Sequence, residues 1–591
     1  MAVAVLAAVS LAACSSSSTT TTPSSTGTTS SAGTPVYGGT LRWVASGDVD
    51  HLDPMSAYYT ATGILERAYT RQLVTYPSSN NYQTGTTIAP DIATVVPSMA
   101  NGGISSDGLT YTFHLRSGVM WNTSPPRAVV AGDFVRMLKR FCNPVLGVGN
   151  PTYYTSTIAG MASYCAAYAK LPSTATATQL ASFQNSNTIT GVSAPDASTL
   201  VIKLSQPASD FLNIMAMTFA SAAPVEWDSY LPDSAAFRQH VYSDGPYQIS
   251  SYVAGKSITL TRNPEWKQSA DPIRHQYIDK MVVTEGTNDP GQALQDLQAG
   301  SGDLLWDLPV PTNQIPTLEA NKDPNFAIWA GHISNPYLVF NMTTGPTANL
   351  KVRQAIEYAI DKVNIAKIYG GTALNPPITT AIPPGNIGYV DYNPYPTPGD
   401  NGDPAKCKSM LAAAGFPNGL TLIDAYRNAG NHPAVFESVQ ADLKACGITV
   451  KGSPQQQGNY YAYLSNPAST KAGKWNISEP GWVPDWFGNN GRTTMQPLFQ
   501  APCVNPTSNY GCYSSTATSN LINKALTATS LSAAATYWHE ADMQVMADAV
   551  IVPFTNQNTP QYHSTRVKNA IWSWTNQLYD PTQLWLSPNT P

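Results

Sequence analysis

The chain carries little charge for its length. Asp, Glu, Lys and Arg make up 12% of its 591 residues, about half of the share that is usual in soluble proteins. The 37 acidic and 32 basic residues leave a formal net charge of −5. Such a weak charge gives no reason to expect nucleic acid as a partner. Beyond residue 13, the sequence has no apolar run long enough to cross a membrane as a helix.

The common catalytic and cofactor motifs are also missing from the sequence. The eight histidines are scattered, and none stands at metal-ligand spacing from another histidine or a cysteine. We find no phosphate-binding loop, no G-x-G-x-x-G and no G-x-S-x-G. His539-Glu540 lacks the second histidine that a zinc protease helix needs. We therefore expect no cofactor, no metal and no enzyme, although an enzyme site built from distant residues remains an alternative.

The first 36 residues are predicted to be an export signal and a tether. Residues 1–13 are uncharged and apolar, as in a secretory signal peptide. Leu11-Ala12-Ala13-Cys14 resembles a bacterial lipobox, which predicts that Cys14 carries a lipid. Residues 14–36 are rich in Ser and Thr and cannot bury enough apolar surface to fold. A lipid-anchored protein outside the cytoplasm is expected, and an ordinary signal peptide with a chance cysteine is the alternative.

Six cysteines remain when Cys14 is set aside, an even number that suits an oxidising compartment. Six cysteines allow fifteen pairings, and sequence alone does not choose among them. Pairing of neighbours is the simplest hypothesis, and buried free thiols are the alternative. Pairing of neighbours joins Cys142 with Cys165, Cys407 with Cys446, and Cys503 with Cys512.

Strand and helix patterns alternate along the rest of the chain. Apolar residues recur at every second position in 109–115 and 200–204, and again at 258 and 260, which predicts half-buried strands. One-sided apolar stripes predict helices over 349–363, 404–414, 432–445 and 532–549. Roughly 555 residues after the tether exceed one core and suggest several domains. The class is therefore α/β or α+β.

A series of short segments, taken in order, resembles the solute-binding proteins of ABC importers, family 5, the oligopeptide- and dipeptide-binding group. The most specific segment is Ser106-Asp-Gly-Leu-Thr-Tyr-Thr-Phe-His-Leu-Arg-Ser-Gly118, followed by Gly132-Asp133. The others are Leu52-Asp53-Pro54, Ala89–Ala93, Ser243–Tyr247, Arg262–Glu265, Leu294–Gly300, Phe340-Asn341, Val352–Ala355, Asp403–Lys406 and Gly447–Val450. Together they cover nearly the whole body, from about residue 38 to 590.

The resemblance implies an α/β, two-lobed periplasmic-binding-protein-like fold (type II, cluster C-like) with a hinge and an inserted subdomain. Lobe I would comprise 37–69, 196–309 and 551–591, with 70–195 as its inserted subdomain. Lobe II would be 310–550. The ligand would bind in the cleft, which closes by hinge motion.

The resemblance also places the ligand. In peptide-binding relatives, the segment that matches Gly481-Trp482-Val483-Pro484-Asp485 runs along the peptide, and its Asp takes the α-ammonium. The expected ligand-binding residues are Gly481, Trp482, Val483, Asp485, Trp486 and Arg492, with Ser56, Ala57, Tyr58, Tyr59 and Thr60 across the cleft. Arg492 could contact a ligand carboxylate or neutralise Asp485, or be merely structural. The aromatic residues Phe487, Tyr460, Tyr461 and Tyr463 could shape pockets, stack on sugars or fill the core.

The sequence therefore predicts a receptor that binds short peptides and delivers them to an ABC permease, and that catalyses no reaction. We expect a monomer held at the membrane by its N-terminal lipid. A non-peptide solute, such as an oligosaccharide or a chelated metal, is the alternative within the same family. An envelope enzyme and a structural surface lipoprotein are the alternatives outside it.

Overall fold

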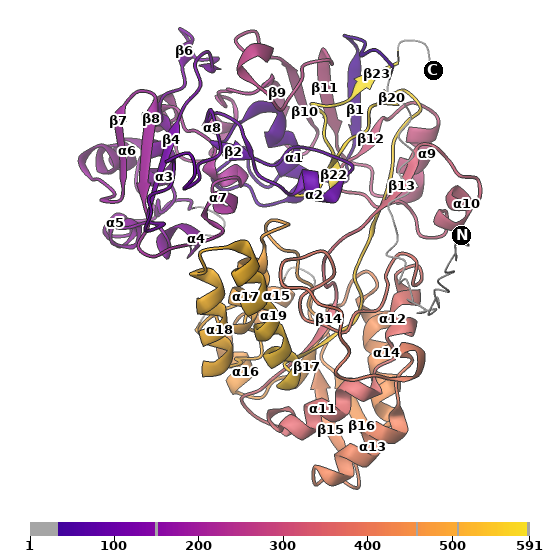
Figure 1. The fold of residues 1–591 in the computed structure, drawn as a ribbon. Coiled ribbons are helices and arrows are strands. Elements are labelled where there is room, and N and C mark those ends of the chain that lie inside the picture. Colours follow the sequence, from indigo (N-terminus) through magenta and orange to yellow (C-terminus); the bar gives the residue numbers. More distant parts are fainter. Residues whose placement is uncertain (1–32, 148–151, 457–458, 505–506, 588–591) are drawn as a thin grey trace, which may run out of the picture.

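The computed structural model describes residues 33–147, 152–456, 459–504 and 507–587. The predicted signal peptide, most of the tether and Cys14 lie outside these ranges. Two lobes stand one above the other (Figure 1), each built around its own five-stranded sheet. We call the one that holds the N-terminal strand lobe I and the other lobe II. The two-lobed α/β architecture is the one that the sequence predicts.

The sheet of lobe I has the order β12-β1-β11-β10-β9. Its strands are β1 (Thr40–Val44), β9 (Tyr247–Val253), β10 (Ser257–Arg262), β11 (Lys280–Thr284) and β12 (Leu304–Leu305). β1 runs parallel to β11 and β12, while β9, β10 and β11 are antiparallel neighbours. Ile258 and Leu260 are fully buried, which confirms the strand predicted there. Helix α1 (Thr60–Tyr69) is almost wholly buried, and its N-terminal end faces lobe II.

An inserted subdomain extends lobe I sideways (Figure 1). It contains the sheet β4-β8-β7, made of β4 (Thr110–His114), β7 (Val192–Asp196) and β8 (Thr199–Lys203), with helices α3 (Ala131–Arg140), α4 (Thr152–Thr155), α5 (Met161–Tyr168) and α6 (Ala177–Ser186). β7 and β8 form one hairpin, so this sheet continues to Lys203, past the expected boundary at residue 195. The subdomain shares one continuous core with lobe I.

Lobe II is built on the sheet β16-β15-β17-β14-β18. Its strands are β14 (Tyr337–Phe340), β15 (Leu420–Asp424), β16 (Ile448–Gly452), β17 (Ile477–Ser478) and β18 (Ile551–Pro553), and the main helices around them are α13 (Pro404–Ala413), α14 (His432–Ala445), α17 (Gly491–Phe499), α18 (Thr516–Leu526) and α19 (Leu531–Ala547). β18 pairs with β14, so residues 551–553 belong to lobe II rather than to lobe I as expected.

The helix predicted over residues 349–363 is two helices. α11 (Leu350–Ala359) ends where Ile360 takes an extended conformation, and α12 (Lys362–Ile368) begins two residues later. The carboxylate of Asp361 accepts a hydrogen bond from the backbone N–H of Asn364 and caps the second helix. The apolar stripe continues across this break because Ile360 is itself buried, so periodicity alone did not reveal it.

Two antiparallel connections join the lobes. β13 (Phe326–Trp329) pairs with β19 (Thr559–Tyr562) in lobe I. After β13 the chain enters lobe II and leads to β14, and after β18 it returns to lobe I at β19. Ser334 and Asn556 pair between the two connections. Because few residues cross here, residues 330–336 and 554–558 are where a hinge motion would be absorbed.

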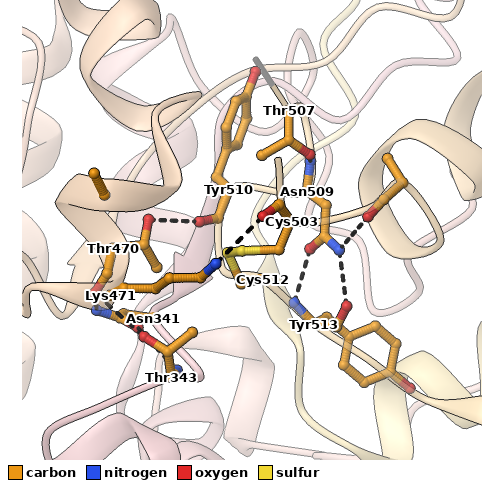
Figure 2. The surroundings of a disulfide bond; sticks show 12 residues. Asn341, Thr343, Thr470, Lys471, Cys503, Thr507, Asn509, Tyr510, Cys512 and Tyr513 are labelled. Carbon is orange, nitrogen blue, oxygen red and sulfur yellow. Dashed lines mark hydrogen bonds between the residues drawn. A yellow bond between two sulfur atoms is a disulfide. The ribbon is translucent and has the colours of Figure 1, made fainter. Parts of the chain in front are cut away.

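The three cysteine pairs are bonded as neighbours: Cys142–Cys165, Cys407–Cys446 and Cys503–Cys512. Figure 2 shows the last pair beside Asn509, whose side-chain amide donates hydrogen bonds to the carbonyls of Ala501 and Tyr513. None of the described helices combines the length and the apolar character that a membrane span requires.

Candidate ligand-binding site

A cavity of about 750 Å³ lies between the lobes. Lobe I contributes the segment 57–60, residues of α1 and the segment 216–219, and lobe II contributes the segment 481–485. Eight aromatic side chains line this cavity: Tyr58, Tyr59, Tyr76, Phe219, Tyr369, Tyr461, Trp482 and Tyr510. A space of this size and lining suits a small organic ligand.

Most of the residues predicted to bind ligand lie on this one lining. Ala57, Tyr58, Tyr59 and Thr60 contribute from lobe I, and Gly481, Trp482, Val483 and Asp485 contribute from lobe II. These segments are about 420 residues apart in the sequence, and the closure of the two lobes brings them together. Their roles toward a ligand remain predictions.

Hydrogen bonds within lobe II and to the hinge hold the segment 481–485 in place. The backbone N–H of Trp482 donates to the carbonyl of Ser334 at 3.1 Å, and its indole Nε1 donates to the carbonyl of Thr493 at 2.8 Å. The backbone N–H of Gly481 donates to the hydroxyl of Tyr461 at 3.2 Å. Pro484 has no N–H to offer a ligand. The segment is therefore a fixed wall, tied to the hinge at Ser334.

The Asp485 carboxylate accepts hydrogen bonds from two phenols of the opposite lobe. The Tyr58 hydroxyl donates to Oδ1 at 2.5 Å, and the Tyr153 hydroxyl donates to Oδ2. Burial, reinforced by the negative charge of Asp485, raises the pKa of Tyr153 well above its usual value. Tyr153 is therefore protonated at neutral pH and can donate this hydrogen bond, and the two phenols together orient the carboxyl group of Asp485.

Three of the expected ligand-binding residues lie behind the lining. Trp486 is fully buried and its ring packs edge-on against Tyr153 at 5.1 Å. Ser56 is buried and donates to the carbonyl of Gly147. The guanidinium of Arg492 is buried in an ion pair with Asp210, 2.7 Å from Nε to Oδ2. Arg492 is therefore not among the residues that line the cavity, and its role toward a ligand stays a prediction.

The aromatic residues near this segment divide in the same way. Tyr461 lines the cavity, whereas Tyr460 is buried in the core of lobe II. Phe487 is also buried and does not line the cavity. Asp53 is buried and forms an ion pair with Arg140 at 2.5 Å. Sequence patterns identified the segment but did not separate the side chains that face the cavity from those that face the core.

Arg427 is a cavity residue that the sequence patterns did not reveal. Its Nη2 donates to the Tyr461 hydroxyl at 2.8 Å, and its guanidinium lies over the rings of Tyr460 and Tyr461, 5.1 and 5.0 Å from their centroids. It follows the carboxyl end of β15, which is parallel to β16. Loops at such strand ends commonly form ligand clefts, and that signal could have singled it out.

His432 lines the same part of the cavity as a neutral base. Burial, together with the positive charge of Arg427, lowers its pKa to about 4. At neutral pH, the positive charge at this part of the wall therefore comes from Arg427, while Asp485 supplies a negative charge elsewhere on the lining. The cavity can thus offer both an anion and a cation to one ligand.

Two lobes connected by crossing segments, with a ligand-sized cavity between them, define the class of two-lobed periplasmic binding proteins. A model of the bacterial extracellular solute-binding proteins, family 5, matches residues 94–499. The chain belongs to this family.

Curated relatives are binding proteins of low sequence identity. Heme-binding protein A of Haemophilus influenzae is 27% identical over 490 residues, which is 80% of each chain. The glutathione-binding protein GsiB of Escherichia coli is 26% identical over 416 residues, 68% of this chain and 69% of the relative.

Solved structures show the same fold. The clavulanic acid biosynthesis oligopeptide binding protein 2 superposes with a TM-score of 0.83 at 25% identity, covering 93% of this chain and 96% of the other. The periplasmic binding protein DppA of Helicobacter pylori, solved with the peptide STSA, has a TM-score of 0.68 at 23% identity and covers 93% and 98%. The family and fold named by the sequence resemblance are thereby confirmed.

Proposed function

We propose that this protein is an extracytoplasmic receptor for short peptides with a free amino terminus, which it delivers to an ABC importer permease. The observation that carries the proposal is the pair of opposite charges on one interlobe cavity, Asp485 and Arg427. A short peptide with free ends carries an ammonium group and a carboxylate group. Asp485 takes the first and Arg427 the second.

The relatives support a small-molecule receptor with this kind of ligand. One is named as a glutathione-binding protein, one as an oligopeptide-binding protein, and one was solved with a bound peptide. All are binding proteins rather than enzymes. We accordingly assign the chain a role in capture and delivery, with no chemical step.

Binding energy in this scheme comes from closure of the cleft. At about 4 Å and an effective dielectric constant near 20, attraction between an ammonium and a carboxylate is about 4 kcal/mol before desolvation is subtracted. The segments 57–60 and 481–485 contact a ligand together only when the lobes are closed, so the ligand favours the closed state. The closed, loaded form is the one that we propose docks on the permease.

The N-terminal region fits this role as a membrane anchor. We propose that Cys14 carries the lipid, that the Ser/Thr-rich segment holds the body clear of the membrane, and that the receptor acts there as a monomer. An anchored receptor stays close to its permease.

A non-peptide solute is the second candidate, and the aromatic lining favours it. Rings such as Trp482, Tyr369 and Tyr510 could stack on the faces of a sugar or of a planar ligand. A metal held directly by the protein is a weaker candidate, because the described residues contain no group of three His, Cys, Asp or Glu side chains suited to one.

Calorimetry with matched ligands separates the two candidates. A free-amine peptide found to bind is compared with its N-acetylated form, on the wild-type protein and on Asp485→Ala. The proposal expects the wild type to bind the free amine more tightly than the acetylated form, and Asp485→Ala to lose most of that preference. Equal binding of both forms to both proteins would contradict it.

A further inference from the structure

We propose that Tyr58 acts as an internal competitor for Asp485, and that the ammonium group of a ligand displaces it into a neighbouring groove. This inference rests on the proposed function, because it concerns how a ligand amine reaches Asp485. It assigns to Tyr58 a role in selecting cationic ligands, which differs from simply lining the cavity.

The two phenols on Asp485 differ in their surroundings. Tyr153 is 3% exposed, packs against Trp486 and is not part of the cavity lining. Tyr58 is 50% exposed and lies on the lining itself. A ligand that enters the cavity therefore meets the hydrogen bond from Tyr58 to Oδ1, while the bond from Tyr153 to Oδ2 stays behind the wall.

The backbone of Tyr58 is held by hydrogen bonds that do not involve its side chain. The backbone N–H groups of Tyr58 and Tyr59 donate to Oδ2 of Asp50, at 2.6 and 3.1 Å. The ring of Tyr58 stacks on Phe219 with a centroid distance of 5.7 Å. Rotation about the side-chain bonds of Tyr58 leaves these backbone contacts in place.

A groove beside the cavity gives the displaced ring a place to go. It measures about 490 Å³ and shares Tyr58, Tyr59 and Thr60 with the cavity. Its other walls include Trp306, Leu308 and Gln577 from the hinge side of lobe I. Tyr58 thus lines both the cavity and the groove. A rotation that takes its ring out of the cavity therefore moves the ring into the groove.

Competition of this kind selects for charge. A ligand hydroxyl or amide would replace one neutral hydrogen-bond donor with another and gain little. An ammonium group brings a full positive charge to a carboxylate that Tyr153 still orients, so it adds a Coulomb attraction to the hydrogen bond that a neutral donor lacks. Removing the Tyr58 hydroxyl should therefore strengthen the binding of amines, whereas removing the Tyr153 hydroxyl should weaken it.

The test compares Tyr58→Phe with Tyr153→Phe, and uses Tyr252→Phe as a control, because the Tyr252 hydroxyl also donates to a carboxylate, that of Asp48, but does not line the cavity or the groove. The probes are a synthetic tripeptide library of random sequence with free amino ends and the same library after N-acetylation. Each purified protein is refolded free of ligand and incubated with each library, and the retained peptides are quantified by mass spectrometry. Thermal unfolding of each variant verifies that it has folded.

We expect Tyr58→Phe to retain the free-amine library about fivefold more tightly than the wild type, the factor that one net hydrogen bond of about 1 kcal/mol represents. Tyr153→Phe should retain it less tightly, Tyr252→Phe should match the wild type, and retention of the acetylated library should not rise in Tyr58→Phe. Unchanged or weaker retention of the free-amine library by Tyr58→Phe overturns the inference. Tyr58 would then only stabilise the contact between the lobes.

Asp485→Asn separates failure of this inference from failure of the proposed function. If Asp485→Asn no longer retains the free-amine library while Tyr58→Phe retains it no more tightly than the wild type, the receptor role stands. Only the role of Tyr58 is then contradicted. If the wild-type protein retains neither library, or retains both equally, the proposed function fails and the inference fails with it.

Discussion

Arg492 and Asp210 form a buried ion pair that spans the two lobes. Arg492 stands at the start of α17 in lobe II, and Asp210 precedes the short helix α7 (Phe211–Ile214) in the core of lobe I. Their side chains are only 2% and 4% exposed, and Nη1 of Arg492 also donates to the hydroxyl of Thr157 at 3.0 Å. The pair is away from the cavity lining, so it favours the closed state without contacting a ligand.

Breaking this pair should open the receptor. Arg492→Leu leaves the Asp210 carboxylate buried without its partner, which costs about 3–5 kcal/mol while the lobes stay closed. Opening lets water reach the carboxylate, so we expect the variant to have a larger radius of gyration by small-angle X-ray scattering. Arg262→Leu removes an exposed ion pair with Asp279 within lobe I and should not change the radius. Equal radii for Arg492→Leu and the wild type would contradict the closing role.

Arg427 should discriminate between free and blocked carboxyl ends. Arg427→Ala removes the cation that lies over Tyr460 and Tyr461, so a peptide with a free carboxylate should bind more weakly, by about 2–5 kcal/mol. The amidated form of the same peptide should bind the variant and the wild type nearly equally. Calorimetry with the two forms measures the difference. Equal losses for both forms would show that Arg427 acts through packing.

The disulfide Cys407–Cys446 should matter for the stability of lobe II. It joins the helices α13 and α14 across a sequence separation of 39 residues, and both cysteines are buried. The double variant Cys407→Ala/Cys446→Ala should lose about 2–5 kcal/mol of unfolding free energy. The matched variant at Cys503 and Cys512, which close a loop of 9 residues, should lose less. Urea unfolding under non-reducing conditions measures both, and the reverse order would contradict the prediction.

Asp542 should make the protein less stable as the pH rises toward neutrality. Its buried carboxyl group on α19 accepts hydrogen bonds from the backbone N–H groups of Ala381 and Ile382, and burial raises its pKa from 3.8 to about 7. Because the folded pKa exceeds the unfolded one, the folded state binds more protons between about pH 4 and pH 7. The contribution of Asp542 to the free energy of unfolding is therefore fully present below pH 4 and is lost as the pH rises to about 7. The change is up to about 4 kcal/mol.

Asp542→Asn keeps an acceptor oxygen and removes the titration. It should unfold at higher urea concentration than the wild type at pH 8, and its stability should change less between pH 5.5 and pH 8. His432 acts in the opposite direction, since its folded pKa of about 4 lies below 6.5 and its contribution is lost as the pH falls. Parallel pH profiles for Asp542→Asn and the wild type would contradict the assignment.

The sequence predicted the elements whose pattern is local. The alternation at 109–115 corresponds to β4, and the one-sided stripe at 432–445 corresponds to α14, because side-chain periodicity is set by backbone geometry. Which sheet a strand joins depends on distant partners. For this reason β8 and β18 fell on the wrong side of the expected domain boundaries.

Within the candidate site, the sequence predicted the segment but not the direction of each side chain. Asp485 and Trp486 are adjacent, yet one lines the cavity and the other fills the core. Arg492 is close to Asp485 in sequence, but its guanidinium forms a buried ion pair with Asp210, about 280 residues earlier in the chain. Such partners are fixed only when the lobes close, so no local pattern reveals them.

The central claim is that Asp485 anchors the amino end of a peptide, and the most direct measurement is mass spectrometry of what the natively purified protein releases on denaturation. The account predicts a ladder of short peptides with free amino termini from the wild type and none from Asp485→Asn. A single non-peptide mass, released equally by both proteins, would contradict the peptide assignment and the anchoring role of Asp485.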